Sequence, residues 1–138
     1  MNNTTSRLND VFFYGLYMSP DILTSKAVEP RDPRIGFAAG YRLRLGNMAT
    51  LLRAEDAQAY GIVYSLTHEE IDRLYTQQGL DMYVSEAVLV TLDSGERAAT
   101  LCKNLLIPPE DNETNPDYEK KLVQCMRQLN VPTTHVPT

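Results

Sequence analysis

Apolar residues recur along much of the chain with the period of two that is typical of β-strands. The clearest example is 41–45, where apolar and basic residues alternate strictly. This alternation predicts a strand with one exposed face, to which Arg42 and Arg44 belong. The strands expected from this pattern and from runs of β-branched and aromatic residues are 10–14, 34–45, 48–52, 59–66, 82–92 and 97–106.

Three helices are expected, each from a capping signal at its start. Ser19 followed by proline predicts an N-cap and a first helical residue, so that a helix covers about 20–26. Thr67 and Glu70 have the spacing of a capping box, which predicts a second helix with an apolar face. The asparagine–proline pair at 115–116 predicts the start of the last helix.

The breaks between these elements follow from proline, glycine and polar residues. We expect a rigid loop at 29–33, which holds two prolines, a polar turn at 54–58 and a hairpin turn at 93–96. Gly79 fits the left-handed position that ends the second helix. Gly61 lies inside a strand pattern, which indicates a bulge or the close approach of another group.

The elements together predict a single α+β domain over 1–138. Strands outnumber helices and most connections have hairpin length, a pattern that favours a small mixed or antiparallel β-barrel with flanking helices. The ends, 1–9 and 132–138, are expected to be loose. At 138 residues with 43% hydrophobic residues, the chain is long enough to bury a core without metals or disulfides.

Charge and residue usage exclude several classes of function. The net charge of −5 with scattered Lys and Arg argues against nucleic-acid binding, and no apolar run approaches a membrane span. Residues 1–6 are polar and do not resemble a secretory signal, so the cytoplasm is the default location. The only cysteines and histidines are Cys102, Cys125, His68 and His135, whose spacing predicts no metal site, cofactor ligation, disulfide framework or His-based triad.

The candidate site begins at 11–18, where a strand-prone run breaks at Gly15 and leads into a helix start. A strand that ends at glycine before a helix presents free backbone N–H groups, which suit a carboxylate or carbonyl oxygen. Most turns of this kind only reverse the chain, so the stretch by itself is a candidate and no more.

Three stretches in order resemble the γ-glutamylcyclotransferase-like (AIG2-like) family. They are 12–18, with its Tyr-Gly loop; 60–74, with a Tyr-Gly-Ile-Val-Tyr strand and the helix after it; and 77–83, with Gln-Gln-Gly and a tyrosine. The resemblance implies a compact β-barrel with a pocket beside the Tyr-Gly loop. The residues it brings to that pocket as substrate-binding groups are Tyr14, Gly15, Leu16, Tyr17, Met18 and Tyr83.

Cyclotransferases of this family cleave γ-glutamyl amides, because the α-amine attacks its own γ-carbonyl and releases 5-oxoproline. This chemistry needs a carboxylate that accepts a proton from the α-ammonium group and donors that hold the developing oxyanion. By resemblance, the loop at 15–18 supplies the donors, and Gly15 lets the backbone approach the ligand.

The chain departs from the family at the position of its catalytic glutamate, where Gln78 stands. A glutamine amide is not a proton acceptor near neutral pH. Asp81 is an alternative base, whereas Glu86 is expected on the strand face opposite Tyr83, pointing to solvent. Three hypotheses stay open: a protein that binds an amino-acid-like or γ-glutamyl-like molecule without standard catalysis, an active cyclotransferase or related amide-cleaving enzyme with a relocated acid, and a protein-interaction module with a vestigial pocket.

Overall fold

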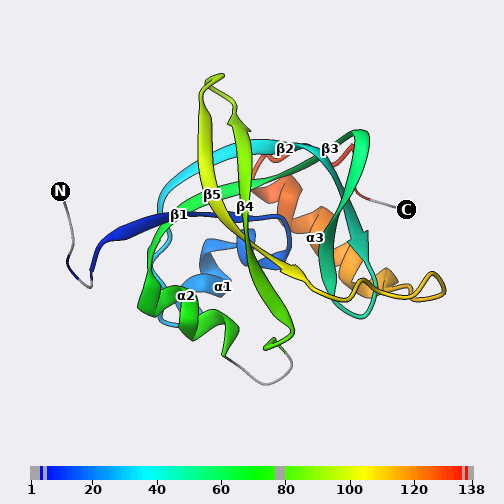
Figure 1. Ribbon diagram of the computed structural model, residues 1–138, viewed down its shortest axis with the longest axis horizontal. Helices are drawn as coiled ribbons and strands as arrows, with labels where there is room; N and C mark the ends of the chain where they lie inside the picture. The colour runs from blue at the N-terminus through cyan, green and yellow to red at the C-terminus, as the bar shows by residue number, and fades with distance from the viewer. Residues whose placement is uncertain (1–3, 5, 77–79, 135, 137–138) are drawn as a thin grey trace.

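A closed five-stranded β-barrel forms the body of the molecule (Figure 1). The computed structural model describes residues 4, 6–76, 80–134 and 136. The strands are β1 (Leu8–Phe13), β2 (Arg31–Leu45), β3 (Ala49–Thr67), β4 (Tyr83–Leu92) and β5 (Arg97–Leu105), in the spatial order β1-β3-β2-β4-β5. Neighbours pair antiparallel except β1 and β5, which run parallel and meet at Val11 and Leu101. The expected small mixed barrel is therefore confirmed.

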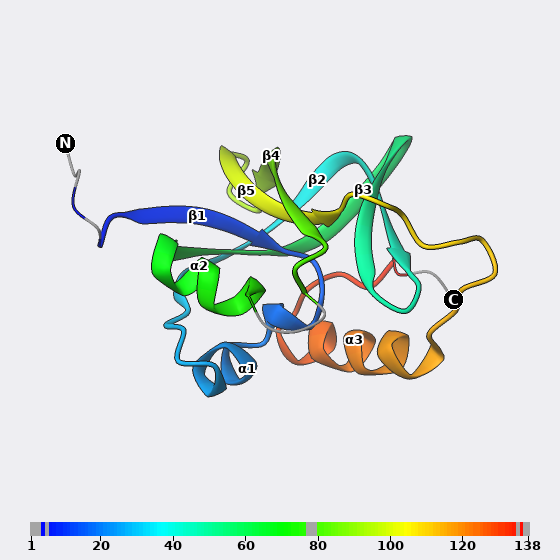
Figure 2. The ribbon, with the colours of Figure 1, turned by 60° about the horizontal axis from the view of Figure 1, so that its bottom comes forward.

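The helices gather on one side of the barrel, as Figure 2 shows. They are the short 3-10 helix η1 (Leu16–Met18) and the α-helices α1 (Pro20–Ser25), α2 (His68–Tyr75) and α3 (Pro116–Gln128). Within the described part of the chain, every helix is too short or too polar to cross a bilayer.

The capping signals in the sequence are confirmed at all three α-helices. The Ser19 side chain accepts a hydrogen bond from the N–H of Ile22, and Asn115 does the same for Tyr118. Thr67 and Glu70 form a complete capping box, in which each side chain accepts from the other residue's backbone N–H. These bonds satisfy N–H groups that the first turn of a helix leaves unpaired.

The second half of β1 is buried on both faces, because the barrel interior covers one face and the helices cover the other. Val11, Phe12 and Phe13 are each no more than 3% exposed, so this strand shows a continuous apolar run instead of alternation. Gly61 on β3 faces it at close range: a Cβ at this position would lie 2.2 Å from the carbonyl oxygen of Phe13. The close approach expected at Gly61 is confirmed.

The prediction of a rigid loop at 29–33 is wrong for residues 31–33, because β2 begins at Arg31 and includes Pro33. The pairing of β2 with β3 shifts register between Arg31 and Arg34. Proline has no N–H to give to a ladder, and the irregularity in the pairing falls at the position where that bond is missing.

The prediction of a polar turn at 54–58 is also wrong, because β3 continues through these residues. The two strands instead accommodate extra residues, and their register shifts between Ala39 and Tyr41. Asp56 and Gly40 have positive φ angles of 62° and 82°, which is the backbone geometry of a bulge. Glu55 and Asp56 are exposed on this part of β3, so solvent reaches their side chains.

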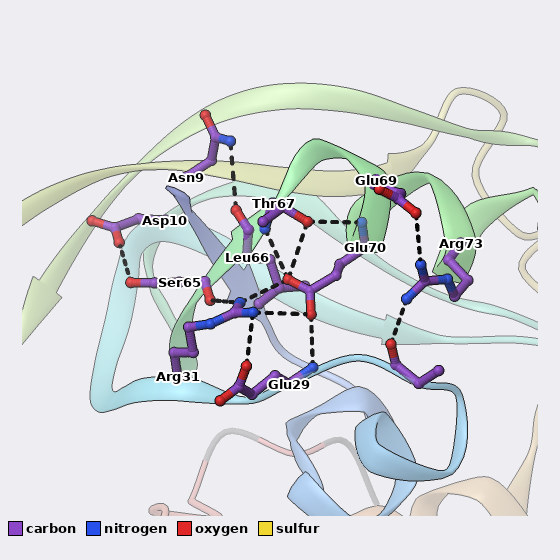
Figure 3. A network of polar contacts seen from close by, with 11 residues as sticks. Asn9, Asp10, Glu29, Arg31, Ser65, Leu66, Thr67, Glu69, Glu70 and Arg73 are labelled. Carbon is purple, nitrogen blue, oxygen red and sulfur yellow. Dashed lines mark hydrogen bonds and ion pairs between the residues drawn. The ribbon is translucent and has the colours of Figure 1, made fainter. Parts of the chain in front are cut away.

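A polar network joins the start of β2 to α2 and fixes the position of that helix (Figure 3). The carboxylate of Glu70 accepts hydrogen bonds from Arg31 at 2.7 Å, from the N–H of Glu29 at 2.8 Å and from the N–H of Thr67 at 3.0 Å. Glu70 is only 7% exposed. The C-terminal end of α2 contacts the loop that follows β1, where the Tyr17 hydroxyl donates to the carbonyl of Leu74 at 3.4 Å.

Candidate functional site

A cavity of about 340 Å³ opens beside the loop that follows β1. Its wall is mainly aromatic: two phenylalanines of β1 and five tyrosines line it, the tyrosines being Tyr14, Tyr17, Tyr75, Tyr83 and Tyr118. These residues come from the β1–α1 loop, α2, β4 and α3, which are far apart in the sequence. The volume is in the range that small-molecule sites occupy.

The structure brings together most of the residues expected at the site. Those that line the cavity are Tyr14, Gly15, Leu16, Tyr17 and Tyr83. Met18 does not line it, because its side chain is fully buried and its carbonyl accepts the Tyr64 hydroxyl at 2.7 Å. Asp81 is exposed and is not part of the wall, and Gln78 lies outside the described residues.

The cavity also contains residues that the sequence did not point to. Tyr75 and Tyr118 come from α2 and α3, Met48 comes from the connection between β2 and β3, and Leu80 comes from the connection between α2 and β4. The one available signal was the Asn-Pro-x-Tyr start of α3, because this motif places Tyr118 one turn inside the helix.

Two tyrosine hydroxyls of the cavity are held by backbone carbonyls. Tyr14 donates to the carbonyl of Lys103 at 2.6 Å, and Tyr83 donates to the carbonyl of Ala49. Because the proton of each is engaged, their oxygens can only accept a hydrogen bond from a ligand. Burial raises the pKa of Tyr14 and of Tyr83 above the ordinary value, so both stay protonated near neutral pH and cannot act as bases.

Gly15 is required by a protein contact. The N–H of Leu16 donates to the Tyr118 hydroxyl at 3.1 Å, and a Cβ on Gly15 would lie 2.5 Å from the same oxygen. The φ angle of Gly15 is −116°, which any residue adopts, so it is the contact with Tyr118 and not the backbone conformation that favours glycine. The sequence predicted close approach by a ligand, whereas the group that approaches Gly15 is Tyr118.

The loop therefore has fewer free donors than the sequence suggested. The N–H of Leu16 is used by Tyr118, and that of Met18 is used by the carbonyl of Gly15. Among the described residues, the N–H groups of Gly15 and Tyr17 have no hydrogen-bond acceptor. These two groups, together with the Tyr118 hydroxyl proton, can donate to a bound oxygen.

A chain of edge-to-face aromatic contacts makes one wall of the cavity rigid. Phe13 contacts Tyr17 at 6.2 Å between ring centres, Tyr17 contacts Tyr75 at 5.8 Å, and Tyr75 contacts Tyr83 at 5.8 Å. Such pairs contribute about 0.5–1.5 kcal/mol each beyond the area they bury. The wall is thus formed before any ligand arrives.

No charged side chain lines the cavity within the described part of the chain. Glu86 lies on β4 in register with Cys102, and its carboxylate accepts a hydrogen bond from Asn104, which is 1% exposed, at 2.8 Å. It is absent from the cavity wall, as expected, although its carboxylate is engaged by a buried amide and not only by solvent. The described residues also hold no cluster of three His, Cys, Asp or Glu side chains that could bind a metal ion.

Comparisons with protein-family models and with curated protein sequences find no match. Solved structures, however, are similar over most of the chain. A γ-glutamyl cyclotransferase superposes with a TM-score of 0.74 at 16% identity, covering 91% of this chain and 82% of that one. A glutathione-specific γ-glutamyl cyclotransferase from yeast gives 0.65 at 14% identity, with 92% and 90% covered.

An AIG2-like protein from Mus musculus adds a third likeness, with a TM-score of 0.55 at 14% identity over 84% of this chain and 94% of that one. The three superpositions each cover at least 84% of this chain and at least 82% of the other protein. The chain has the fold of the γ-glutamyl cyclotransferases and AIG2-like proteins.

Proposed function

We propose that the protein binds a small amino-acid-like or γ-glutamyl-like molecule in the cavity and lacks standard cyclotransferase activity. The observation that carries this proposal is the cavity itself: it lies beside the Tyr14-Gly15 loop, its aromatic wall is preformed, and its described lining has no carboxylate. It is a binding site without an evident base.

The chemistry of cyclisation explains why the base matters. The α-ammonium group of a γ-glutamyl amide must lose a proton before its nitrogen can attack the γ-carbonyl. The lining tyrosines cannot accept that proton, because burial raises the pKa of Tyr14, Tyr75 and Tyr83. Gln78 occupies the position of the family glutamate in the sequence, and its amide cannot accept the proton either.

The polar groups that remain suit recognition of such a molecule. The Tyr14 and Tyr83 oxygens can accept from its ammonium group, since both hydroxyls donate to backbone carbonyls. The free N–H groups at Gly15 and Tyr17 can donate to an oxygen of the ligand. The apolar lining can take the remainder of the molecule.

The test restores the base. Gln78→Glu should release 5-oxoproline from a γ-glutamyl dipeptide at least about 10²-fold faster than the unmutated protein, since a positioned general base contributes about 10²–10⁴ in rate. Gln77→Glu is the matched control, because it adds the same charge one residue away in the sequence. Equal activity of both variants, with both folded, would mean that a missing base at Gln78 does not explain the lack of activity.

The unmutated protein is measured in the same assay. Substantial 5-oxoproline release without any substitution would overturn the proposal, and loss of that release in Asp81→Asn would then identify Asp81 as the relocated base. Binding is tested separately by thermal stabilisation with a γ-glutamyl dipeptide, where a ligand at 100 times its Kd adds about 2.7 kcal/mol. No stabilisation by any γ-glutamyl compound or free amino acid would favour a protein-interaction module with a vestigial pocket.

A further inference from the structure

Lys103 is not one of the residues that line the cavity, but it contacts two of the tyrosines that do. Its backbone carbonyl accepts the Tyr14 hydroxyl at 2.6 Å, and its ammonium nitrogen lies 5.2 Å from the centre of the Tyr75 ring. Both tyrosines line the cavity. The strand and the ring thus hold one positive charge beside a site whose described lining is neutral.

The charge of Lys103 has no counterion among the described residues. The ion pairs of the described chain engage Arg31, Arg34 and Arg73, and Lys103 takes part in none of them. Its side chain is half-buried, so water screens the charge only in part. An anion in the cavity would therefore lie near a cation that no described protein group neutralises.

The nearest acidic residue on the neighbouring strand faces elsewhere. Lys103 is in register with Ser85 on β4, whereas Glu86 is in register with Cys102 and binds Asn104, both of which are fully buried. Successive residues of a strand point to opposite faces, so Glu86 and Lys103 lie on opposite faces of the β4–β5 ribbon. Glu86 therefore cannot serve as the counterion of Lys103.

We infer that the Lys103 ammonium group anchors the carboxylate of the molecule that the cavity binds. The inference deepens the proposed function, on which it rests for the identity of the cavity as the ligand site. An aromatic cavity also suits an organic cation, but Lys103 would repel one at this position. A zwitterionic amino acid satisfies all the groups present: its carboxylate pairs with Lys103, and its ammonium group donates to the tyrosine oxygens.

A carboxylate fits this site better than a phosphate. Lys103 places its ammonium group over the ring of one lining tyrosine, and the described lining itself brings no positive charge. One ammonium group balances one negative charge, whereas phosphate sites in proteins combine several cations or a helix N-terminus. The expected ligand class is a monocarboxylate with an apolar or amide-bearing remainder.

Three probes test separately what the carboxylate and the ammonium group of the ligand contribute to binding. They are L-γ-glutamylanilide, its decarboxylated analogue 4-amino-N-phenylbutanamide, and 3-phenylpropionate, which keeps only a carboxylate and a ring. Their Kd values are measured by calorimetry on the unmutated protein and on Lys103→Gln, Lys103→Arg and Lys120→Gln. Lys120 is an exposed lysine of α3 outside the cavity, so its substitution controls for the loss of one charge.

Lys103→Gln should weaken L-γ-glutamylanilide about 10- to 100-fold, since one charge-assisted hydrogen bond is lost. The decarboxylated analogue is an organic cation, so it should bind Lys103→Gln at least as tightly as the unmutated protein, which also shows that the cavity is intact. Lys103→Arg should keep most of the affinity, and Lys120→Gln should keep all of it.

The same measurements distinguish failure of the inference from failure of the proposed function. If L-γ-glutamylanilide binds but Lys103→Gln weakens neither probe, or weakens both equally, the inference is overturned while the proposed function stands. If L-γ-glutamylanilide does not bind but 3-phenylpropionate does, and its binding needs Lys103, the inference stands and the proposed function fails. Binding of none of the probes overturns both.

Discussion

Replacing Glu70 with glutamine should destabilise the protein through the network that joins β2 to α2. Burial by itself raises the pKa of Glu70. Hydrogen bonds from Arg31 and from the N–H groups of Glu29 and Thr67 outweigh this effect and lower the pKa to about 2, from an ordinary value of 4.5. That difference corresponds to about 3 kcal/mol of stability at neutral pH. We expect about 2 kcal/mol for the substitution, because the Arg31 side chain is 29% exposed and solvent screens the pair.

The loss should depend on pH in a defined direction. The pKa of Glu70 is lower in the folded state than in the unfolded state, so its contribution is complete above about pH 4.5 and is lost as the pH falls toward 2. The difference in unfolding free energy between the unmutated protein and Glu70→Gln should therefore shrink by about half between pH 7 and pH 3.

Urea unfolding followed by circular dichroism measures these differences. Glu69→Gln is the matched control, because Glu69 is the neighbouring residue, its side chain is 82% exposed and it pairs with Arg73 one turn away. This control should lose no more than about 0.5 kcal/mol. A Glu70→Gln variant as stable as Glu69→Gln at pH 7, or a gap between them that does not change at pH 3, would refute the reasoning.

Two further predictions concern the elements around the cavity. Thr67→Ala should cost about 0.5–2 kcal/mol by removing the cap of α2, without changing ligand affinity, and a melting temperature equal to that of the unmutated protein would contradict it. Gly15→Ala should cost about 1–3 kcal/mol, because its Cβ would lie 2.5 Å from the Tyr118 oxygen. Tyr118→Phe should recover part of that loss, and additive effects in a double-mutant cycle would show that the two residues do not interact.

The fold was predictable where the local pattern and the tertiary environment agree. The alternation at 41–45 and the caps at Ser19 and Thr67 depend on neighbours within a few residues, and the structure has all of them. The turn expected at 54–58 failed for the opposite reason. Its residues form strand because β2 pairs alongside and a bulge at Asp56 absorbs the extra length, and neither fact can be deduced from a polar pentapeptide.

The part of the site that was predictable is the part formed by one continuous segment of the chain. The loop at 14–17 carries its signal in a glycine between a buried strand and a helix, and the resemblance added Tyr83. Tyr75 and Tyr118 have ordinary positions on apolar helix faces, so only packing shows that their rings face the cavity. The position of Lys103 beside the cavity was also not predictable, because in the sequence it is one basic residue of an alternating strand.

The hydrogen bond between the N–H of Leu16 and the hydroxyl of Tyr118 joins residues 102 positions apart. The first strand leaves the ribosome long before the last helix does, so the loop after β1 is made without the partner that holds it. Contacts between residues this far apart in the sequence form slowly, because the intervening chain must be ordered first. The cavity is therefore completed late in folding, and a nascent chain that ends before α3 has the strands of the barrel but not the finished cavity.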